Sequence, residues 1–446
     1  MLRELGCSLI AYWVLSSLGA AQTVWHVDAA AAPGGNGMTW GAAFHSLDQA
    51  IQISVDGDEI WVAAGVYKPR VRTDAADPRS VSFQPPGGVN LYGGFDGTEL
   101  TLSARVELFR GTILDADIGV LGRRTDNAYH VLRLEGNGAY HTVDGFQLRN
   151  GHASGDGIAG RGGAIYSMLG IKQIRNCTFI NNHAEKGGAL NSSSGVVYLS
   201  RSIFEGNSST RSGGAMRVAF DLYASNCIFV SNLAGLSGGA VFLSQSLEYL
   251  DGTPRPTFQN CLFYGNKARK SGGAVFLSTG GVTNTPGQVN LSGCTIFGNE
   301  AQEAGGGVGT PPGFTQMADA RLRNSIVWGN SAAQEPQLGG EFTHYSVDYS
   351  DIEGGWYGNG NIDQAPLFQD PRLGRFTLRA ASPCIDAGDN SRVTLDLHDL
   401  DADGSLLEPT PLDLGSYPRF TNDPATVDTG AGAAPITDIG CMEFPF

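Results

Sequence analysis

Charged residues are scarce in this sequence of 446 residues, and basic residues are the scarcer kind. Charged residues make up 16% of the chain, with 29 Lys and Arg against 44 Asp and Glu, which gives a net charge of −15. A chain this acidic repels nucleic acid and anionic membrane surfaces, which excludes both as partners. It attracts cations instead, and calcium above all.

Long apolar runs are absent except near the N-terminus. Residues 9–18 form an apolar stretch that ends in small residues, and no other stretch is apolar enough to span a membrane. This arrangement is typical of a secretory signal peptide, residues 1–21, cleaved near Ala20 or Ala21. Cys7 precedes most of the apolar run, whereas a lipoprotein cysteine closes it. We therefore expect a secreted, extracellular or cell-surface protein without a lipid or helical anchor.

Glycine is abundant, at 63 residues, and much of it belongs to a repeated motif. A Gly-Gly pair followed by a small and then an apolar residue begins at Gly162, Gly187, Gly213, Gly238, Gly272 and Gly305. A second motif alternates with the first and consists of Cys or Ser, an apolar residue two positions later and Asn five positions later. Its copies begin at Cys177, Ser202, Cys227, Cys261, Cys294 and Ser325.

The second motif has the spacing of an extended strand. Its alternating apolar residues, such as Phe179 and Phe204, predict a strand with one face turned inward. Because stacked strands lie about 4.8 Å apart, the closing Asn predicts a ladder in which each side-chain amide bonds to the amide of the next coil. The predicted ladder residues are Asn182, Asn207, Asn232, Asn266, Asn299 and Asn330. The Gly pairs suit tight corners, where a positive φ costs Gly little.

The repeat length selects the fold. Successive pairs from Gly163 to Gly239 are 25, 26 and 25 residues apart, which is too short for a propeller blade. The amphipathic helices of helical solenoids and the consensus of leucine-rich repeats are absent. The sequence therefore predicts an all-β fold, a right-handed parallel β-helix or solenoid with a dry core, with coils over residues 91–350 and clean repeats over 162–330.

The motifs also resemble those of known proteins. The GGA[IV] and FxxN repeats are similar to those of polymorphic outer-membrane proteins and, more widely, of right-handed β-helix proteins of bacterial surfaces. Residues 27–69, the sequence ASPCIDAGDN from Ala381 and the sequence DIGCMEF at 438–444 resemble secreted β-helix proteins with a choice-of-anchor Q domain, which usually end in DIGAYEF. The resemblance covers nearly the whole mature chain and implies the fold and the compartment, but no agreed biochemical activity.

Both ends of such a stack need covers, because an open end exposes unpaired strands and core. Residues 44–53 have apolar residues at helical spacing and predict a short capping helix within an N-terminal cap and first coils, 22–90. Residues 351–446 are predicted to form an irregular C-terminal cap with the choice-of-anchor Q-like end. Trp356 and Tyr357 are expected to pack in this cap rather than to stack on sugars.

Six cysteines remain after cleavage of the signal. Four of them occupy one strand position, where other coils have Ser202 and Ser325. A position filled by Cys or Ser requires a small buried side chain, so we expect buried free thiols there. Cys384 and Cys441 are candidates for a disulfide across the C-terminal cap, which their spacing alone leaves open.

Repeat length varies at only one corner. Each ladder Asn lies 6 or 7 residues before the second Gly of the following Gly-Gly pair. The distance from the second Gly of a pair to the Cys or Ser that begins the next copy of the second motif is 14, 14, 13, 22, 21 and 19 residues along the chain. Three neighbouring loops near 245–256, 279–287 and 309–320 therefore lie side by side. They are either tolerated insertions or a rim that binds a glycan or a protein through Tyr249 and Phe314.

No catalytic signature stands out. Ser/His/Asp, zinc and phosphate-loop patterns are absent, and the lyases and hydrolases that share this architecture need acidic clusters with an acidic or basic partner. The candidates are Asp115, Asp117, Asp144, Lys267, Arg269 and Lys270. The basic candidates belong to a row of mixed residues in neighbouring coils, so solvated turns are the favoured interpretation.

A run of alternate acids matches the start of a calcium loop, namely Asp399, Asp401 and Asp403 followed by Gly404. Alternate carboxylates converge in such a loop, and Gly permits the sharp turn. The closing acid is missing because Thr410 stands in its place, and Glu408 or Asp413 substitutes only with a different loop path. A structural Ca²⁺ site and an acidic turn without metal both remain open.

The favoured function is adhesion or the binding of a glycan or protein ligand, without catalysis and without a required cofactor. A polysaccharide lyase or glycoside hydrolase of pectate-lyase-like fold is the first alternative, because fold alone does not carry function. A structural surface or spacer element is the second. We expect a monomer whose partner is a polysaccharide or a surface protein.

Overall fold

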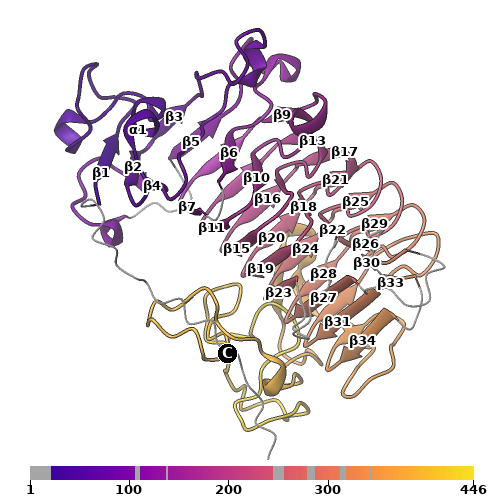
Figure 1. Ribbon diagram of the computed structural model, residues 1–446. Coiled ribbons are helices and arrows are strands. Elements are labelled where there is room, and N and C mark those ends of the chain that lie inside the picture. The colour runs from indigo at the N-terminus through magenta and orange to yellow at the C-terminus, as the bar shows by residue number, and fades with distance from the viewer. Residues whose placement is uncertain are drawn as a thin grey trace, which may run out of the picture.

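The chain is a stack of coils whose strands lie one above another along a single axis (Figure 1). The fold is a right-handed parallel β-helix, as the repeat length predicts. Among the residues that the structure describes, no helix is long and apolar enough to cross a bilayer. This computed structural model describes residues 22–105, 111–136, 139–244, 256–278, 287–311, 318–340 and 344–445.

Four parallel sheets form the walls, and we number them in the order in which a regular coil visits them. Sheet 1 contains β1 (Val24–Val27), β2 (Glu59–Ala63), β4 (Asn90–Phe95), β7 (Tyr140–Asp144), β11 (Ile171–Arg175), β15 (Val196–Ser200), β19 (Asp221–Ser225), β23 (Thr257–Gln259), β27 (Gly287–Ser292), β31 (Ala318–Arg323) and β34 (Tyr345–Asp348). Sheet 2 contains β3 (Gly65–Tyr67), β5 (Thr112–Asp115), β8 (Gln147–Arg149), β12 (Thr178–Ile180), β16 (Ile203–Glu205), β20 (Ile228–Val230), β24 (Leu262–Tyr264), β28 (Thr295–Phe297), β32 (Ile326–Trp328) and β35 (Asp351–Ile352).

The other two sheets complete each coil. Sheet 3 contains the short strands β9 (His152–Ala153), β13 (His183–Lys186), β17 (Ser208–Ser212), β21 (Leu233–Ala234), β25 (Lys267–Ala268) and β29 (Glu300–Ala301). Sheet 4 contains β6 (Leu132–Glu135), β10 (Ile165–Met168), β14 (Leu190–Ser192), β18 (Met216–Val218), β22 (Val241–Ser244), β26 (Val275–Ser278), β30 (Val308–Gly309) and β33 (Leu338–Gly339). An antiparallel pair, β36 (Phe368–Asp370) and β37 (Arg375–Leu378), follows the stack.

The helical elements are short. One α-helix, α1 (Leu47–Ile53), lies near the N-terminus. The 3₁₀ turns are η1 (Trp40–Ala42), η2 (Pro78–Ser80), η3 (Leu102–Ala104), η4 (Arg124–Asp126), η5 (Gly157–Gly160), η7 (Pro371–Leu373) and η8 (Asn390–Arg392).

Equivalent residues of successive coils pair in register and stack their side chains. Phe179, Phe204, Phe229 and Phe263 follow one another in sheet 2, with ring centroids 4.3, 5.0 and 4.8 Å apart. All four are fully buried. The core is therefore a continuous column in which each coil packs mainly on the coils above and below it.

The asparagine ladder lies at the corner between sheet 2 and sheet 3. Each ladder Asn except the last, Asn330, donates from Nδ2 to Oδ1 of the next one, over distances from 2.9 to 3.1 Å. The same Nδ2 also donates to a backbone carbonyl, as Asn207 does to Phe179 O at 2.9 Å. The ladder residues are 0 to 6% exposed, so these bonds satisfy amides that no water reaches.

The two glycines of each pair have different tasks. The first has a positive φ, as at Gly187, where φ is 64°. The second has no room for a side chain, because a Cβ on Gly214 lies 2.1 Å from the carbonyl oxygen of Gly239 in the next coil. A left-handed conformation and a close approach of two backbones thus both require glycine at this corner.

A further corner was not predicted from the sequence. The residue before the Cys or Ser position has a φ between 45° and 52° at Asn176, Arg201, Asn226, Asn260 and Asn324. Asn adopts this left-handed conformation more readily than most residues, which explains why it stands at four of these five positions.

The N-terminal helix covers the open end of the stack. Helix α1 buries Leu47, Ala50 and Ile51 against the first strands. The predicted helix began at residue 44, three residues too early, because Ser46 and Gln49 form a capping box that starts the helix at Leu47. Phe44 lies before the helix and pairs with Val27.

The C-terminal segment covers the end of the stack only in part. Trp356 packs on Tyr345 in the last coil, with ring centroids 5.5 Å apart. Tyr357 is 84% exposed, so the expectation that both aromatics pack in the cap is wrong for Tyr357. The two side chains belong to one turn, and Trp356 packs against the core.

The rest of this segment runs back along the side of the stack (Figure 1). Phe368 and Phe376 pack on Phe297, and Phe376 also packs on Tyr264. The outer face of sheet 2 is apolar in these later coils, and this apolar surface explains the path of the segment.

All six cysteines of the described chain are free and buried. Burial raises the pKa of the Cys177 thiol to about 12, so it behaves as a small apolar side chain. Cys384 and Cys441 lie in the same apolar cluster without a disulfide, and Cys384 Sγ donates to Asp351 Oδ2 at 3.3 Å.

Candidate functional site

The loop corner lies where the repeat lengths predict it. The three long connections join β22 to β23, β26 to β27 and β30 to β31, all between sheet 4 and sheet 1. Tyr249 and Phe314 lie outside the described residues. Their binding role stays a prediction.

The carboxylates considered for catalysis are held by basic and amide side chains. Asp115 Oδ2 forms an ion pair with Arg149 at 2.8 Å, and its Oδ1 accepts from Asn150 Nδ2 at 2.9 Å. Asp144 Oδ2 accepts from both Arg105 and Arg175 at 2.8 Å. These buried acids therefore stabilise the early coils.

The other catalytic candidates lie away from Asp115 and Asp144. Asp117 Oδ2 accepts from the backbone of Gly122 at 2.9 Å, within its own turn. Lys267 lies in sheet 3, several coils later, where its Nζ is 2.8 Å from Glu300 Oε2. The structure does not bring the acidic and basic candidates together.

Five carboxylates gather in the predicted calcium turn. Asp396, Asp401 and Glu408 each offer an oxygen within 4.8 Å of the others, and so do Asp399, Asp401 and Asp403. Glu408 takes the place of the missing closing acid of the calcium loop, which the sequence allowed only with a different loop path. Asp396 was not predicted as a ligand. Asp413 lies elsewhere, fully buried, and accepts from the backbone of Tyr417 and Glu443.

The acidic turn has the chemistry of a hard-cation site. Glu408 Oε1 is buried and has no hydrogen-bond partner among the described residues. Burial, and then repulsion by the neighbouring carboxylates, raises the pKa of Glu408. Calcium prefers 6 to 8 oxygen ligands, and the donors that converge here are all carboxylate oxygens. The residues present fit Ca²⁺.

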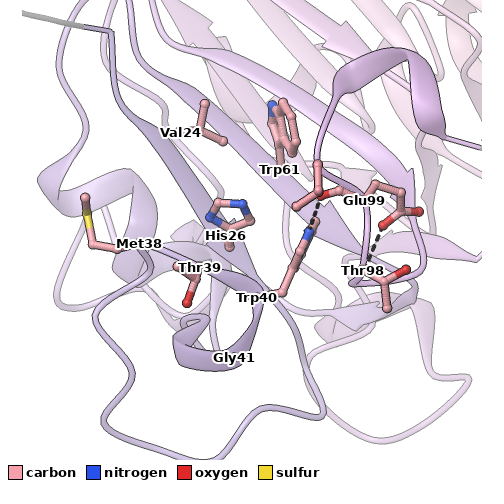
Figure 2. A pocket seen from close by; sticks show the side chains of 10 residues that line it. Val24, His26, Met38, Thr39, Trp40, Gly41, Trp61, Thr98 and Glu99 are labelled. Carbon is pink, nitrogen blue, oxygen red and sulfur yellow. Dashed lines mark hydrogen bonds between the residues drawn. The ribbon is translucent and has the colours of Figure 1, made fainter.

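An aromatic pocket that the sequence analysis missed lies on the first coils. It has a volume of about 500 Å³ and opens on the outer face of sheet 1. Its walls come from β1, η1, β2 and the turn after β4, as Figure 2 shows. Its lining residues are Val24, His26, Met38, Thr39, Trp40, Gly41, Trp61, Thr98, Glu99 and Leu100.

Strand register builds the back wall of this aromatic pocket. His26 in β1 pairs in register with Trp61 in β2, which places both rings on the outer face, 5.8 Å apart. Trp61 stacks on Phe95 at 4.8 Å and is only 7% exposed. The Trp40 ring meets His26 edge to face at 4.7 Å. Three aromatic rings thus meet in one hollow.

Hydrogen bonds fix the walls. Trp40 Nε1 donates to the carbonyl oxygen of Glu99 at 2.8 Å, which joins η1 to the turn after β4. The Glu99 carboxylate accepts from the backbone N–H groups of Asp96, Gly97 and Thr98. Burial opposes the charge of Glu99, but these bonds outweigh it and lower its pKa.

The aromatic pocket is rigid at its back and apolar at its rim. Burial lowers the pKa of His26, against the hydrogen bond to Gly37 O, so this ring is neutral at neutral pH. Met38 and Leu100 stand at the rim and are 53% and 90% exposed. Exposed apolar side chains beside a preformed hollow are typical of a ligand site.

One signal for this aromatic pocket was available in the sequence. Trp25, Trp40 and Trp61 are three of the six tryptophans and fall within 37 consecutive residues. Their density marks the first coils, but only the pairing of β1 with β2 shows which rings face outward. Trp25 faces the other way and packs on Phe44.

Comparison with known proteins supports the fold. Residues 131–332 match the family described as right handed beta helix region. No curated protein matches the sequence.

Several solved structures are similar. Pectate lyase Pel9A is 13% identical, with a TM-score of 0.48 over 96% of this chain and 97% of that one. Pectin methylesterase PemA from Erwinia chrysanthemi is 11% identical, with a TM-score of 0.40 over 81% and 99%. Tailspike protein gp49 of Acinetobacter baumannii bacteriophage Fri1, a capsular polysaccharide depolymerase, is 11% identical, with a TM-score of 0.39 over 75% and 60%. Their likeness to this chain concerns the fold alone.

Proposed function

We propose that this chain is a secreted or cell-surface protein that binds a glycan in the aromatic pocket and catalyses no reaction on it. The observation that carries the proposal is the open hollow between Trp40, Trp61 and His26. Its volume is within the usual range for small-molecule sites.

Sugar rings suit these walls. A pyranose has apolar C–H faces that pack on aromatic rings, and hydroxyl groups at its edge that need polar partners. Trp40 and Trp61 provide the rings, and Thr39 and Thr98 bring hydroxyl groups to the lining. Because the backbone is fixed by hydrogen bonds before any ligand arrives, binding costs little ordering of the protein.

The chemistry of the aromatic pocket favours binding over catalysis. Glu99 is the one carboxylate in the lining, and backbone N–H groups occupy its oxygens. The acid pair that a glycosidase needs is therefore not offered by this lining. The buried Asp115 and Asp144 are engaged by arginines elsewhere.

Replacing Trp40 by Ala is expected to weaken glycan binding at least about tenfold, which corresponds to about 1.4 kcal/mol. The substitution removes one aromatic wall and its hydrogen bond to Glu99 O. Glycan-array screening of the purified full chain identifies the ligand, and calorimetric titration then gives the dissociation constant for wild type and variant.

Tyr417→Ala is the matched control, because Tyr417 is an aromatic residue 57% exposed in the C-terminal segment. It should bind the glycan as wild type does. Thermal melts of both variants establish that they are folded. An array without any retained glycan, or equal affinity for wild type and Trp40→Ala, contradicts the proposal.

We further propose that the acidic turn binds a structural Ca²⁺ ion. Asp401 belongs to both groups of converging carboxylates. Calcium at 100 times its Kd stabilises the folded chain by about 2.7 kcal/mol, which raises the Tm by a few degrees. We expect this rise on adding CaCl₂ after EGTA treatment, and we expect Asp401→Asn to abolish it.

Two comparisons make the calcium test specific. Asp428→Asn removes an exposed carboxylate outside both groups and should keep the full calcium response. Magnesium at the same concentration should give a smaller rise, because Mg²⁺ demands stricter octahedral geometry. A calcium response that persists in Asp401→Asn, or that is missing in wild type, contradicts the proposal.

A further inference from the structure

Four basic side chains gather on the edge between sheet 3 and sheet 4, although the chain as a whole is strongly acidic. They are Arg161 after η5, Lys186 in β13, Arg211 in β17 and Arg217 in β18. We call them the basic patch. Strands β13 and β17 are neighbours in sheet 3, and β18 belongs to the adjoining sheet 4 (Figure 1).

The backbone explains why they meet. Arg161 and Lys186 pair as a parallel bridge in neighbouring coils. Lys186 pairs with Ser212 across a register shift, and Arg211 lies within this bulge. Arg217 approaches from sheet 4, since a Cβ on Gly187 lies 3.0 Å from its backbone nitrogen. Two sheets and a bulge thus bring four cations to one corner.

The charges of the basic patch are poorly balanced. Within the described part of the chain, Glu185 is the one carboxylate at ion-pair distance from any of the four. Its Oε1 lies 3.2 Å from Arg211 Nη1 and 3.7 Å from Lys186 Nζ. Arg217 donates from Nη2 to Ser244 Oγ, a neutral acceptor. Among the described residues, four cations therefore share one anion.

The cations repel one another. Burial, and then repulsion by Arg161 and Arg211, lowers the pKa of Arg217. Burial also lowers the pKa of Lys186, with Arg211 and Arg161 acting in the same direction against Glu185. A bound anion relieves both the repulsion and the partial loss of solvation.

A buried donor without a partner lies beside the basic patch. Asn191 pairs in register with Arg217 in sheet 4 and is fully buried. Its Oδ1 accepts from Ser193 Oγ at 3.0 Å, whereas its Nδ2 has no hydrogen-bond partner among the residues that the structure describes. An unsatisfied buried donor is unfavourable unless something accepts its hydrogen bond.

We propose that the basic patch binds the carboxylate or sulfate groups of an acidic polysaccharide. The cations of successive coils are about 4.8 Å apart along the stack, a step close to the length of one sugar unit. A chain with one charge per sugar can meet several of them. A denser polyanion such as nucleic acid is disfavoured, because the net charge of −15 repels it outside the basic patch.

This inference concerns a second site and does not rest on the aromatic pocket. The basic patch lies in β13, β17 and β18, whereas the aromatic pocket lies in β1 and β2. Trp40→Ala should leave binding of acidic glycans at the basic patch unchanged. Arg217→Gln should leave binding at the aromatic pocket unchanged. The two proposals therefore fail separately.

The test is biolayer interferometry of the full chain on immobilised oligogalacturonate, dextran sulfate and neutral dextran at low salt. We expect retention by one or both acidic glycans, which distinguishes carboxylate from sulfate recognition, and none by dextran. Arg217→Gln, and separately Arg211→Gln, should weaken the acidic glycan at least about tenfold. Both variants should also flatten the dependence of log Kd on log salt, because fewer counterions are released.

Arg375→Gln, which removes an exposed cation in β37, is the control and should bind as wild type does. Arg211 has a side chain 55% exposed, so Arg211→Gln keeps the test valid if Arg217→Gln fails to fold. Equal binding to dextran and to both acidic glycans overturns the proposal. Unchanged affinity in folded Arg211→Gln and Arg217→Gln overturns it as well.

Discussion

Replacing Asn232 by Leu is expected to destabilise the β-helix by about 3–5 kcal/mol, because buried groups lose partners that nothing replaces. Asn232 Oδ1 accepts from both the backbone N and the Nδ2 of Asn207, at 3.0 and 3.1 Å. Asn232 Nδ2 donates to Phe204 O and to Asn266 Oδ1, each at 2.9 Å. Leu has a similar volume and forms none of these bonds.

Denaturant unfolding followed by circular dichroism measures this loss. Asn359→Leu is the control, since Asn359 is exposed and outside the ladder, and its free energy of unfolding should change by less than about 0.5 kcal/mol. Because each coil contacts only its neighbours, the damage should start at the coils on either side of Asn232. A loss below about 1 kcal/mol argues that the ladder is not a main source of stability.

Replacing Arg419 by Met is expected to destabilise the attachment of the C-terminal segment by about 3–5 kcal/mol. Arg419 is fully buried, with Nη1 3.0 Å from Glu443 Oε1 and Nη2 donating to Asp438 O at 3.0 Å. Burial raises the pKa of Glu443 far above its ordinary value, and Arg419 acts against this shift. Without Arg419, a buried carboxylate loses its counter-charge.

The pH dependence of the Arg419→Met variant follows from the sign of that shift. An acid whose pKa is raised by folding stabilises the fold when it is protonated, and this stabilisation is lost as the pH rises through the raised value. The destabilisation should therefore be smaller at acidic than at alkaline pH. Unfolding curves and limited proteolysis of the C-terminal segment at both pH values measure it.

The double variant Arg419→Met with Glu443→Gln separates the missing charge from the lost packing. It should recover part of the stability and lose most of the pH dependence, because no uncompensated carboxylate remains. Arg375→Met, on the exposed start of β37, serves as a control and should behave as wild type. A single variant as stable as wild type at alkaline pH contradicts the role given to the ion pair.

Local repeats made the β-helix predictable. The glycine pairs, the stacked Phe179 to Phe263 row and the ladder each recur at a fixed position, and the same environment in every coil selects the same residue. The corner that carries the long loops was predicted for the same reason, since insertions lengthen only one interval of the repeat. The left-handed row at Asn176 and its equivalents was missed because Arg201 interrupts it.

The candidate sites were less predictable because they depend on register. His26, Trp40, Trp61 and Glu99 come from four separate segments, and only the pairing of β1 with β2 and the bond between Trp40 and Glu99 bring them together. In the acidic turn, the sequence identified three of the five acids by their spacing and named Glu408 as a substitute on a different loop path. Asp396 and Glu408 lie outside the motif spacing and join the others through the fold of the turn.

The basic patch was not predicted, because the sequence shows only a row of mixed acidic and basic residues at this corner. Glu185 and Lys186 stand at one corner position in the sequence, which suggests solvated turns without a shared site. The bulge in β17 adds Arg211 to this corner, and Arg217 arrives from the next sheet around a glycine pair. Neither contribution is visible in the spacing of the motifs.

The sequence by itself determined the coil, its corners and its ladder, because each of these depends on contacts between equivalent residues of adjacent repeats. Only the tertiary structure decided the path of the C-terminal segment and the composition of the aromatic pocket, the acidic turn and the basic patch. These features depend on how irregular segments come together, as in the ion pair of Arg419 with Glu443. No repeat constrains them, so their geometry follows from how the irregular segments pack on the regular stack.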